Sequence, residues 1–590
     1  MRRMPSILMM IALFAGFGAF LIYPIWLTVS DAFVHTDASG DSSFTVYHIT
    51  AVFSDPMLRA GLLNAFGIAI GTTLLCFIMA LPLAVLNANY EFPGKSIFGA
   101  LVLIPLILPP FVGAIGLHHL LGRTGTVNSI LADLGITEML INWGWLDPSA
   151  AAGIDFIGTG GFWAIVVVEA LHLYPILYLN ATAALANLDP TLDEAAVNLG
   201  ASRWKRFRQI TLPLIRPGLF AGATIVFIWS FTELGTPLMF DYQVVTPVQI
   251  FNGIKEMEAS KQPYALTAVM LFAAVMFYVV GKLIFGGKAY AMYSKASIQA
   301  TTQRLSLLPG LAASALFGLV IFLAILPHLG VILTSVSNVG DWYNSALPGS
   351  YTLDHYGTAL GHDLATGSIR NSLFYASIAV VVDLIVGLMI GYIVVRTKLF
   401  GRSLLDALAM LPLAVPGLVM AFGFVAMSLR WPFADGAPLA GLVDVLGADP
   451  NPALLLIIAY AVRRLPYVVR ATVAGLEQTS GELEEAARNL GATPIRAVRT
   501  IIIPLIMANL IAGALLAFSF AMLEVSDSLI LAQRRGDYPI TKAIYELFAR
   551  LGDGQHIASA MGVWGMALLG VTLIGASLMM GKRMGAIFRV

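Results

Sequence analysis

The sequence is poor in charged residues and in cysteine. Only 12% of its 590 residues are charged, and 58% are hydrophobic. Soluble domains carry about 25% charged residues, so this deficit excludes a large soluble protein and indicates lipid surroundings. The net charge is zero, and nothing in it favours nucleic acid as a partner. The single cysteine, Cys76, excludes an intrachain disulfide or a cysteine metal cluster. We expect it to be a small buried hydrophobe.

Motifs for common chemistries are also missing. The sequence has no G-x-x-x-x-G-K-[ST] phosphate loop, because "EFPGKS" around Lys95 lacks the upstream glycine. It has no H-E-x-x-H and no cysteine–histidine cluster, and we interpret the isolated pair His118-His119 as structural or interfacial. This absence of a metal or nucleophile constellation argues against a membrane-embedded enzyme. No cofactor or metal is expected on this chain.

Long apolar runs dominate what is present. A run of about 20 apolar residues is long enough to cross a bilayer as a helix, and prolines are expected to interrupt some of these runs at Pro82, Pro105, Pro109, Pro412, Pro416 and Pro466. The sequence predicts an all-α membrane protein with about twelve transmembrane helices. The expected spans are 6–30, 61–87, 97–121, 161–181, 214–236, 264–286, 305–335, 369–396, 403–429, 453–475, 505–530 and 556–582.

The distribution of basic residues predicts the orientation. If both termini lie in the cytoplasm, most lysines and arginines fall in cytoplasmic segments, as the positive-inside rule requires. The opening MRRMPS and the apolar run that follows it lack a clear small-x-small cleavage site. We therefore expect this run to be a retained first transmembrane helix in a multi-pass protein.

The two halves of the sequence form an internal repeat. Asn64 and Asn371, like Gly94 and Gly401, are 307 residues apart, whereas later pairs such as Gly200 and Gly491 are 291 apart. The first half thus carries a net 16 extra residues, in an exterior loop near 142–160 whose function the sequence leaves open. Six spans per half imply a parallel repeat. We expect a first half at 1–286, a cytoplasmic linker at 287–304 and a second half at 305–590.

A charged element, expected at about 189–213 and 479–504, recurs on the cytoplasmic side of each half. In the first copy Asp189 can cap a helix that Pro190 begins, and Gly200 can end it in a left-handed turn. In the second copy Thr479 and Glu482 are expected to form a capping box. Each copy predicts two short surface helices joined at a glycine, ahead of a span that begins at a proline. The expected apolar faces comprise Leu192, Ala195, Ala196 and Leu199 in one copy and Ala486, Ala487 and Leu490 in the other.

This element resembles the E-A-A loop of ABC importer permeases. The motif is E-A-A, three residues, G, nine residues, I-x-L-P. It is complete at Glu194-Ala195-Ala196, Gly200 and Ile210–Pro213, and it recurs at Glu485-Ala486-Ala487, Gly491 and Ile501–Pro504 with one isoleucine for leucine. The fused form, with "VRRLPYVVR" before the second loop, most resembles the ferric-iron class, which includes phosphonate and thiamine permeases. The resemblance implies two type I permease domains and gives these eight Glu, Ala and Gly residues an ATPase-coupling role.

Acidic residues within spans are costly and often functional. Glu233 and Glu524 are repeat equivalents near the exterior ends of their spans. We expect them to face one substrate pathway, although two ordinary helix-end carboxylates are an equal alternative. Glu169 and Asp383 lack such matches and are interpreted as structural. Arg463 and Arg464 must pair or face water, with partners that the sequence does not assign.

Together these patterns predict a permease of a binding-protein-dependent ABC importer in the bacterial inner membrane. Its expected partners are membrane lipid, two copies of an ATPase subunit that bind ATP, and a periplasmic substrate-binding protein. Ferric iron leads as substrate by the resemblance alone, with phosphonate, thiamine or another small anion or organic solute as alternatives. An ion-coupled secondary transporter fits a parallel repeat less well, because it gives no reason for two E-A-A loops.

Overall fold

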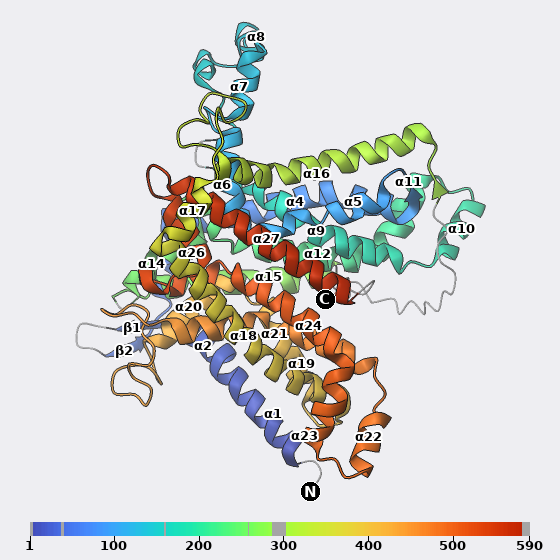
Figure 1. Ribbon diagram of the computed structural model, residues 1–590, viewed down its shortest axis with the longest axis vertical. Helices are drawn as coiled ribbons and strands as arrows, with labels where there is room; N and C mark the ends of the chain where they lie inside the picture. Colours follow the sequence, from blue (N-terminus) through green and yellow to red (C-terminus); the bar gives the residue numbers. More distant parts are fainter. Residues whose placement is uncertain (1–3, 37–40, 159–160, 258, 286–302, 581–590) are drawn as a thin grey trace. The chain divides into compact units, whose positions relative to one another are not determined.

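A computed structural model describes residues 4–36, 41–158, 161–257, 259–285 and 303–580. The described chain is predominantly α-helical (Figure 1), as expected, and its strands are a short antiparallel pair, β1 with β2, and a two-residue parallel pair, β3 with β4. Most of the expected linker lies outside the described residues.

The elements of the first half include five short 3-10 or π helices, which are labelled η, as are those of the second half. They are α1 (Met4–Phe17), η1 (Gly18–Ile22), α2 (Tyr23–Asp31), β1 (Val34–Thr36), β2 (Ser42–Phe44), α3 (Tyr47–Ser54), α4 (Pro56–Asn89), β3 (Tyr90–Glu91), α5 (Lys95–Leu101), η2 (Ile104–Ile107), α6 (Pro110–Leu121), α7 (Thr126–Asp133), α8 (Ile136–Asn142), η3 (Pro148–Ala152), α9 (Phe162–Ala186), α10 (Pro190–Asn198), α11 (Arg203–Arg206), η4 (Phe207–Thr211), α12 (Leu212–Phe231), α13 (Gly235–Met239), α14 (Thr246–Gly253), η5 (Ile254–Glu256) and α15 (Gln262–Phe285).

The elements from β4, at the end of the expected linker, through the second half follow the same order, with fewer pieces between the third and fourth spans. They are β4 (Gln303–Arg304), α16 (Leu307–Val336), α17 (Asp354–Gly361), α18 (Asp363–Arg396), α19 (Arg402–Met410), η6 (Leu411–Leu413), α20 (Gly417–Ser428), α21 (Ala453–Glu477), α22 (Glu482–Asn489), α23 (Pro494–Ala497), η7 (Val498–Ile502), α24 (Ile503–Met522), α25 (Ser526–Leu531), η8 (Arg535–Asp537), α26 (Ile540–Phe548) and α27 (Gly554–Met580).

Helices occupy all twelve expected span positions. Among the described residues, nine helices are long and apolar enough to cross a membrane, and two bent helix pairs form further spans. The remaining position is α21, a 25-residue helix that carries Arg463, Arg464 and Arg470. The expectation that Pro82 and Pro466 interrupt their spans is wrong, because both lie inside continuous helices. A proline in a membrane helix is tolerated where neighbouring groups satisfy the freed carbonyl.

Proline does break the third span of each half. The pair from Lys95 to Asp133 bends by 96°, and the pair from Arg402 to Ser428 bends by 100°. Leu108, which precedes Pro109, is extended (φ −112°, ψ 124°), as the clash with a following proline ring favours. The helix cannot continue through such a residue, so α6 and α20 start anew inside the membrane.

The chain divides into two compact units that do not follow the two repeats. One comprises Met1–Arg59, Gln249–Leu271 and Asp354–Arg589, and the other comprises Ala60–Val248 and Phe272–Leu353. We call them unit 1 and unit 2. The first span of each half therefore belongs to the unit built mainly from the other half.

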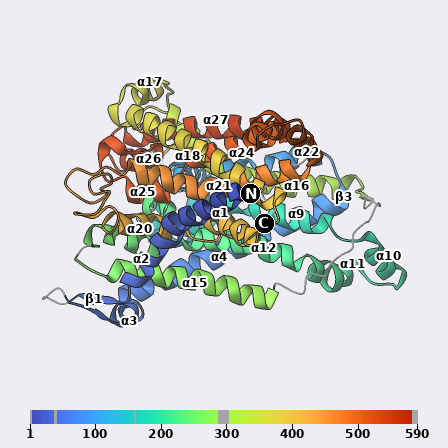
Figure 2. The same cartoon turned by 90° about the horizontal axis from the view of Figure 1, so that it is seen from below.

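Small residues and an ion pair hold these exchanged spans. In unit 1, α2 lies beside α20 (Figures 1 and 2), and Gly423 lets the backbone of Pro24 approach closely. Asp31, at the end of α2, accepts from Arg430 (2.7 Å) and from Lys261 (3.2 Å).

In unit 2, α16 packs on α6 where Gly116 meets Gly330, and a Cβ on either glycine would overlap the backbone of the other helix. Such small-residue contacts are typical of packed membrane helices.

The core of unit 2 is built from α4, α9, α12 and α16. It includes Leu83, Tyr174 and Phe317, all inaccessible to solvent. Cys76 lies in this core and is fully buried, which confirms its interpretation as a small hydrophobe.

Candidate functional site

The first E-A-A loop begins with the expected cap. The Asp189 carboxylate accepts a hydrogen bond from the backbone N–H of Thr191 (2.9 Å) at the start of α10. This bond, with a second from the Thr191 hydroxyl, lowers the pKa of Asp189 below its usual range. Pro190 occupies the first turn of α10, as predicted.

Both loop helices end in the same glycine turn. Gly200 (φ +74°) and Gly491 (φ +90°) adopt the left-handed conformation, which confirms them as helix stops. The N–H of Ala201 donates to the carbonyl of Ala196, and the N–H of Ala492 donates to that of Ala487. This 6→1 bond, beside a 5→2 bond from each glycine, defines the Schellman motif.

The second helix of each loop runs on into the next span, and the expectation of a separate surface helix is wrong. Arg203–Phe231 and Pro494–Met522 are each one helix of 29 residues. A π turn, η4 or η7, precedes Pro213 and Pro504. Because π turns are wider than α turns, they relieve the clash of a proline ring with the preceding turn. Each glycine turn is therefore followed by one continuous helix that includes α12 or α24.

The expected capping box of the second loop is wrong. No side chain caps α22 at Gly481, and the N–H of Glu482 donates to the hydroxyl of Ser480 instead. Thr479 is held by Arg396 of α18, whose Nη2 donates to the Thr479 carbonyl and hydroxyl, each at 2.8 Å. Arg396 thus bonds the carbonyl and hydroxyl of Thr479 as a donor, whereas the sequence pattern predicted that Glu482 would accept from the Thr479 N–H.

The resemblance-derived residues lie on or beside exposed faces of these helices. Glu194, Ala195, Glu485 and Ala486 are exposed, Ala487 is half-buried and Ala196 is buried. Beside the glycines, Leu199 is 88% exposed and Leu490 is 90% exposed. Trp204 and Ile495, at equivalent positions on the following helices, are 69% and 81% exposed. Exposed apolar side chains clustered in this way mark an interaction surface.

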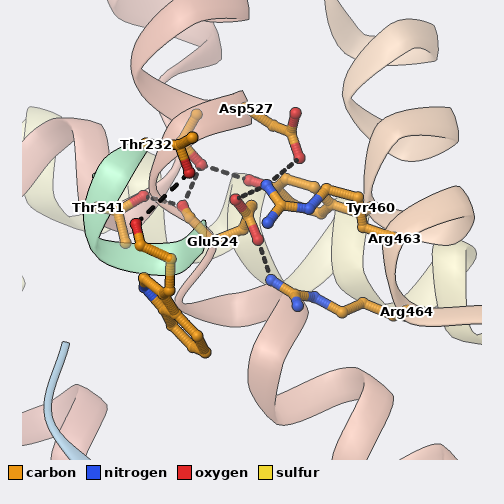
Figure 3. Close-up of polar contacts among 9 residues, drawn as sticks. Thr232, Tyr460, Arg463, Arg464, Glu524, Asp527 and Thr541 are labelled. Carbon is orange, nitrogen blue, oxygen red and sulfur yellow. Dashed lines mark hydrogen bonds and ion pairs between the residues drawn. The ribbon is translucent and has the colours of Figure 1, made fainter. Parts of the chain in front are cut away.

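A buried charge cluster lies in unit 1 where α24 ends (Figure 3). Arg463 Nη1 donates to Glu524 Oε1 (2.6 Å), and Arg464 Nη2 donates to Glu524 Oε2. Asp527 Oδ2 lies 3.5 Å from the same Arg463 nitrogen. Glu524 is only 4% exposed. The structure therefore supplies the partners that the sequence left unassigned.

The cluster also contacts the first residue of α20 and the first turn of α26. A Cβ at Gly417, the first residue of α20, would overlap the Arg463 guanidinium. A cation at a helix N-terminus opposes the helix dipole, and the carboxylates of Glu524 and Asp527 offset that cost. The Thr541 hydroxyl donates to the Glu524 carbonyl (2.6 Å), which ties α26 to the same corner.

The equivalent corner in unit 2 is different. Glu233 follows α12 as Glu524 follows α24, but its carboxylate accepts from the backbone N–H of Thr236 (3.3 Å) and is only partly buried. His172, the counterpart of Arg463, bonds the Pro105 carbonyl through Nδ1 (2.8 Å). The repeat thus conserves the position of the carboxylate but not its surroundings.

The other two intramembrane acids are buried. Glu169 accepts from the Ser230 hydroxyl and, at 3.5 Å, from Thr72, which fits its structural interpretation. Asp383 in α18 is buried, and its Oδ2 has no hydrogen-bond partner among the described residues. No group of three or more metal-ligating side chains occurs among these residues.

Sequence reasoning missed two contributors to these sites. Gly417 and Arg396 belong to no motif, and their roles depend on helices brought together by folding. One signal was available for Arg396: a lone arginine at the end of an apolar run, just before the cytoplasmic side, can cap carbonyls at a neighbouring helix end.

Two E-A-A-type loops, each continuous with a span of a duplicated helical core, define a membrane permease. The chain belongs to the family of the binding-protein-dependent transport system inner membrane component, which matches residues 77–290 and 383–584. It is the permease of an ABC importer.

Relatives with curated names agree with this family. The chain is 27% identical over 526 residues to the putative ferric transport system permease protein FbpB 1 of Haemophilus influenzae, covering 87% of this chain and 76% of that one. It is 27% identical over 470 residues to the ferric transport system permease protein FbpB of Actinobacillus pleuropneumoniae, covering 78% and 62%. It is 30% identical over 194 residues to the molybdenum transport system permease protein ModB of Escherichia coli K12, covering 32% and 74%.

Proposed function

We propose that this permease imports ferric iron, delivered by a periplasmic substrate-binding protein and driven by two ATPase subunits. The names of the two FbpB relatives, which match most of this chain, support iron as substrate. The shorter match to ModB supports a metal oxyanion as the second candidate. ATP would bind on the partner subunits, and both termini of this chain would lie in the cytoplasm.

One observation carries the coupling proposal. The same glycine turn, with an exposed leucine beside it, precedes the long helix that contains α12 and the long helix that contains α24. We assign ATPase docking to the faces around Gly200 and Gly491, with Glu194, Ala195, Ala196, Glu485, Ala486 and Ala487. Two equivalent faces on one chain fit two copies of one partner. Glu233 and Glu524, which follow the last residues of α12 and α24, would line the substrate route.

The docking prediction is tested at the glycines. A β-branched residue is disfavoured in the left-handed conformation by about 1–2 kcal/mol, and no atom beyond the chain neighbours lies within 4 Å of a Cβ at either glycine. The double variant Gly200→Val, Gly491→Val should therefore insert at normal abundance and lose most of the ATPase subunit on co-purification. The exposed Gly357→Val (a residue with equally open surroundings and no left-handed φ) is the control. Normal co-purification by the double variant would contradict the docking assignment.

The substrate is tested by transport. Proteoliposomes that contain this chain, its ATPase subunits and its binding protein should accumulate ⁵⁵Fe only when ATP and the binding protein are present. Molybdate uptake without iron uptake would select the second candidate. Uptake driven by an ion gradient without ATP would instead favour a secondary transporter.

A further inference from the structure

The two E-A-A loops are held by different contacts. In the first loop, Arg206 of α11 forms an ion pair with Asp193 of α10. This pair crosses the glycine turn and joins the two helices of the first loop to each other. At the 291-residue offset, Arg206 corresponds to Ala497 and Asp193 corresponds to Glu484. The second loop therefore has the acid without the internal arginine.

The acid of the second loop instead reaches a transmembrane helix. The Tyr392 hydroxyl of α18 donates to Glu484 Oε1 at 2.7 Å. Glu484 is buried, unlike its neighbours Leu483 and Glu485, and Arg488 of the same helix lies 3.6 Å from it. A hydrogen bond to a charged acceptor is stronger than one between neutral groups.

One turn further along α18, Arg396 makes a second attachment. Its Nη2 donates to the Leu476 carbonyl (3.0 Å) and to Thr479. Leu476 lies in the last turn of α21, where an arginine side chain can hydrogen-bond the carbonyls of the helix end. The segment between α21 and α22 is thereby fixed to α18. The first half cannot form either contact, because Tyr392 and Arg396 correspond there to Val85 and Asn89.

An apolar joint closes the same corner. Tyr392 and Val395 of α18 pack against a buried core that includes Ile506, and Val498 and Ile503 pack against the same core. Within unit 1, the end of α18 is thus joined both to the loop helix α22 and to the start of the helix that contains α24.

We propose that Tyr392 and Arg396 are positioning residues that make α22 move together with α18. This inference rests on the proposed coupling function of the loops. A displacement of the second loop then enters the membrane through two helices, α18 and α24, which flank the arginines of α21. Among the described residues no hydrogen bond joins the first loop to α4, so a displacement of that loop enters through α12. ATP-driven displacements of the two loops accordingly reach the membrane helices by unequal routes.

Tyr392→Phe is the central test, because it removes one hydroxyl and keeps the ring in the apolar joint. In proteoliposomes of the full importer, ATP hydrolysed per substrate transported should rise about fivefold, the order of effect expected from losing one hydrogen bond. Glu484→Gln keeps an acceptor oxygen and should remain near the wild-type ratio, whereas Glu484→Ala should match Tyr392→Phe. Tyr375→Phe, at the other end of α18, is the matched control.

A measurement without the partners separates this inference from the proposed function. In the permease alone, hydrogen exchange of 482–489 should accelerate in Tyr392→Phe and in Arg396→Gln, with 190–198 unchanged. Unchanged exchange at 482–489 in both variants, or an unchanged ATP-to-substrate ratio in Tyr392→Phe, would overturn the proposal. If exchange accelerates but the wild-type chain neither binds an ATPase subunit nor requires ATP, the contact stands and the coupling role fails with the proposed function.

Discussion

At the scale of single residues, Glu524 has contacts that its repeat equivalent lacks, because the two carboxylates have different surroundings. Its position matches that of Glu233, and the sequence suggested one role for both. The ion pairs with Arg463 and Arg464 make Glu524 part of a buried network, whereas the Glu233 carboxylate accepts from the N–H and hydroxyl of Thr236 at the start of α13. Such pairing joins residues about 60 positions apart, on helices whose contact no local pattern encodes.

This difference predicts unequal effects on stability. Glu524→Gln should destabilise the folded chain by about 3–5 kcal/mol, because removing one partner leaves buried arginines uncompensated. Glu233→Gln should stay within about 0.5 kcal/mol, as is usual for substitutions outside buried networks. Thermal unfolding of the two purified variants in one detergent gives the comparison.

Equal melting temperatures for the two variants would mean that water, rather than the arginines, surrounds Glu524. Transport measured on the same samples separates the pathway proposal from this stability effect. A loss of uptake in the stable Glu233→Gln variant would support a role in the route.

At the scale of elements, apolar length and proline position predicted the spans and both breaks. Pro109 and Pro416 act locally, through a clash with the preceding residue, and such effects can be inferred without a structure. The capping box failed because Thr479 is held by an arginine more than 80 residues away. The continuity of each loop with its span was missed because Pro213 and Pro504 resemble helix starts unless a π turn precedes them.

The contact between α6 and α16 gives an element-scale prediction. Gly330→Leu places a side chain where the backbone of Gly116 lies, so the two helices must separate. Overpacking of this kind costs about 1–3 kcal/mol or more, and we expect a clear fall in the melting temperature of the purified protein.

Gly318→Leu on the same helix is the matched control, because no atom lies within 4 Å of a Cβ there. It tests whether a leucine on α16 is harmful in itself. A Gly330→Leu protein as stable as Gly318→Leu would show that α6 and α16 do not meet at their glycines.

At the scale of the whole molecule, the repeat was evident from constant offsets, but the division into compact units was not. Sequence similarity reports which segments descend from a common half, whereas packing depends on contacts such as Asp31 with Arg430 that need both halves. The halves 1–286 and 305–590 remain a description of the repeat.

The orientation of the chain is a further prediction at this scale. In a Cys76→Ala background, Asp537→Cys should react with an impermeant thiol reagent in intact cells, and Ser202→Cys should react only after permeabilisation. The two positions test opposite faces in one experiment. Labelling of Ser202→Cys in intact cells would invert the topology, and with it the placement of both E-A-A loops.

Because the first span packs with the second half of the chain, its contacts form only late in synthesis. Asp31 leaves the ribosome 230 residues before Lys261 and 399 residues before Arg430. At about 5–20 residues per second, the second interval lasts about 20–80 s. The earliest helix is therefore among the last to be fixed, and throughout that time its carboxylate lies at the membrane without the arginine that later neutralises it. A chain that stalls before residue 261 therefore carries an acid at the end of its first span without either of the two cations that Asp31 contacts in the folded protein.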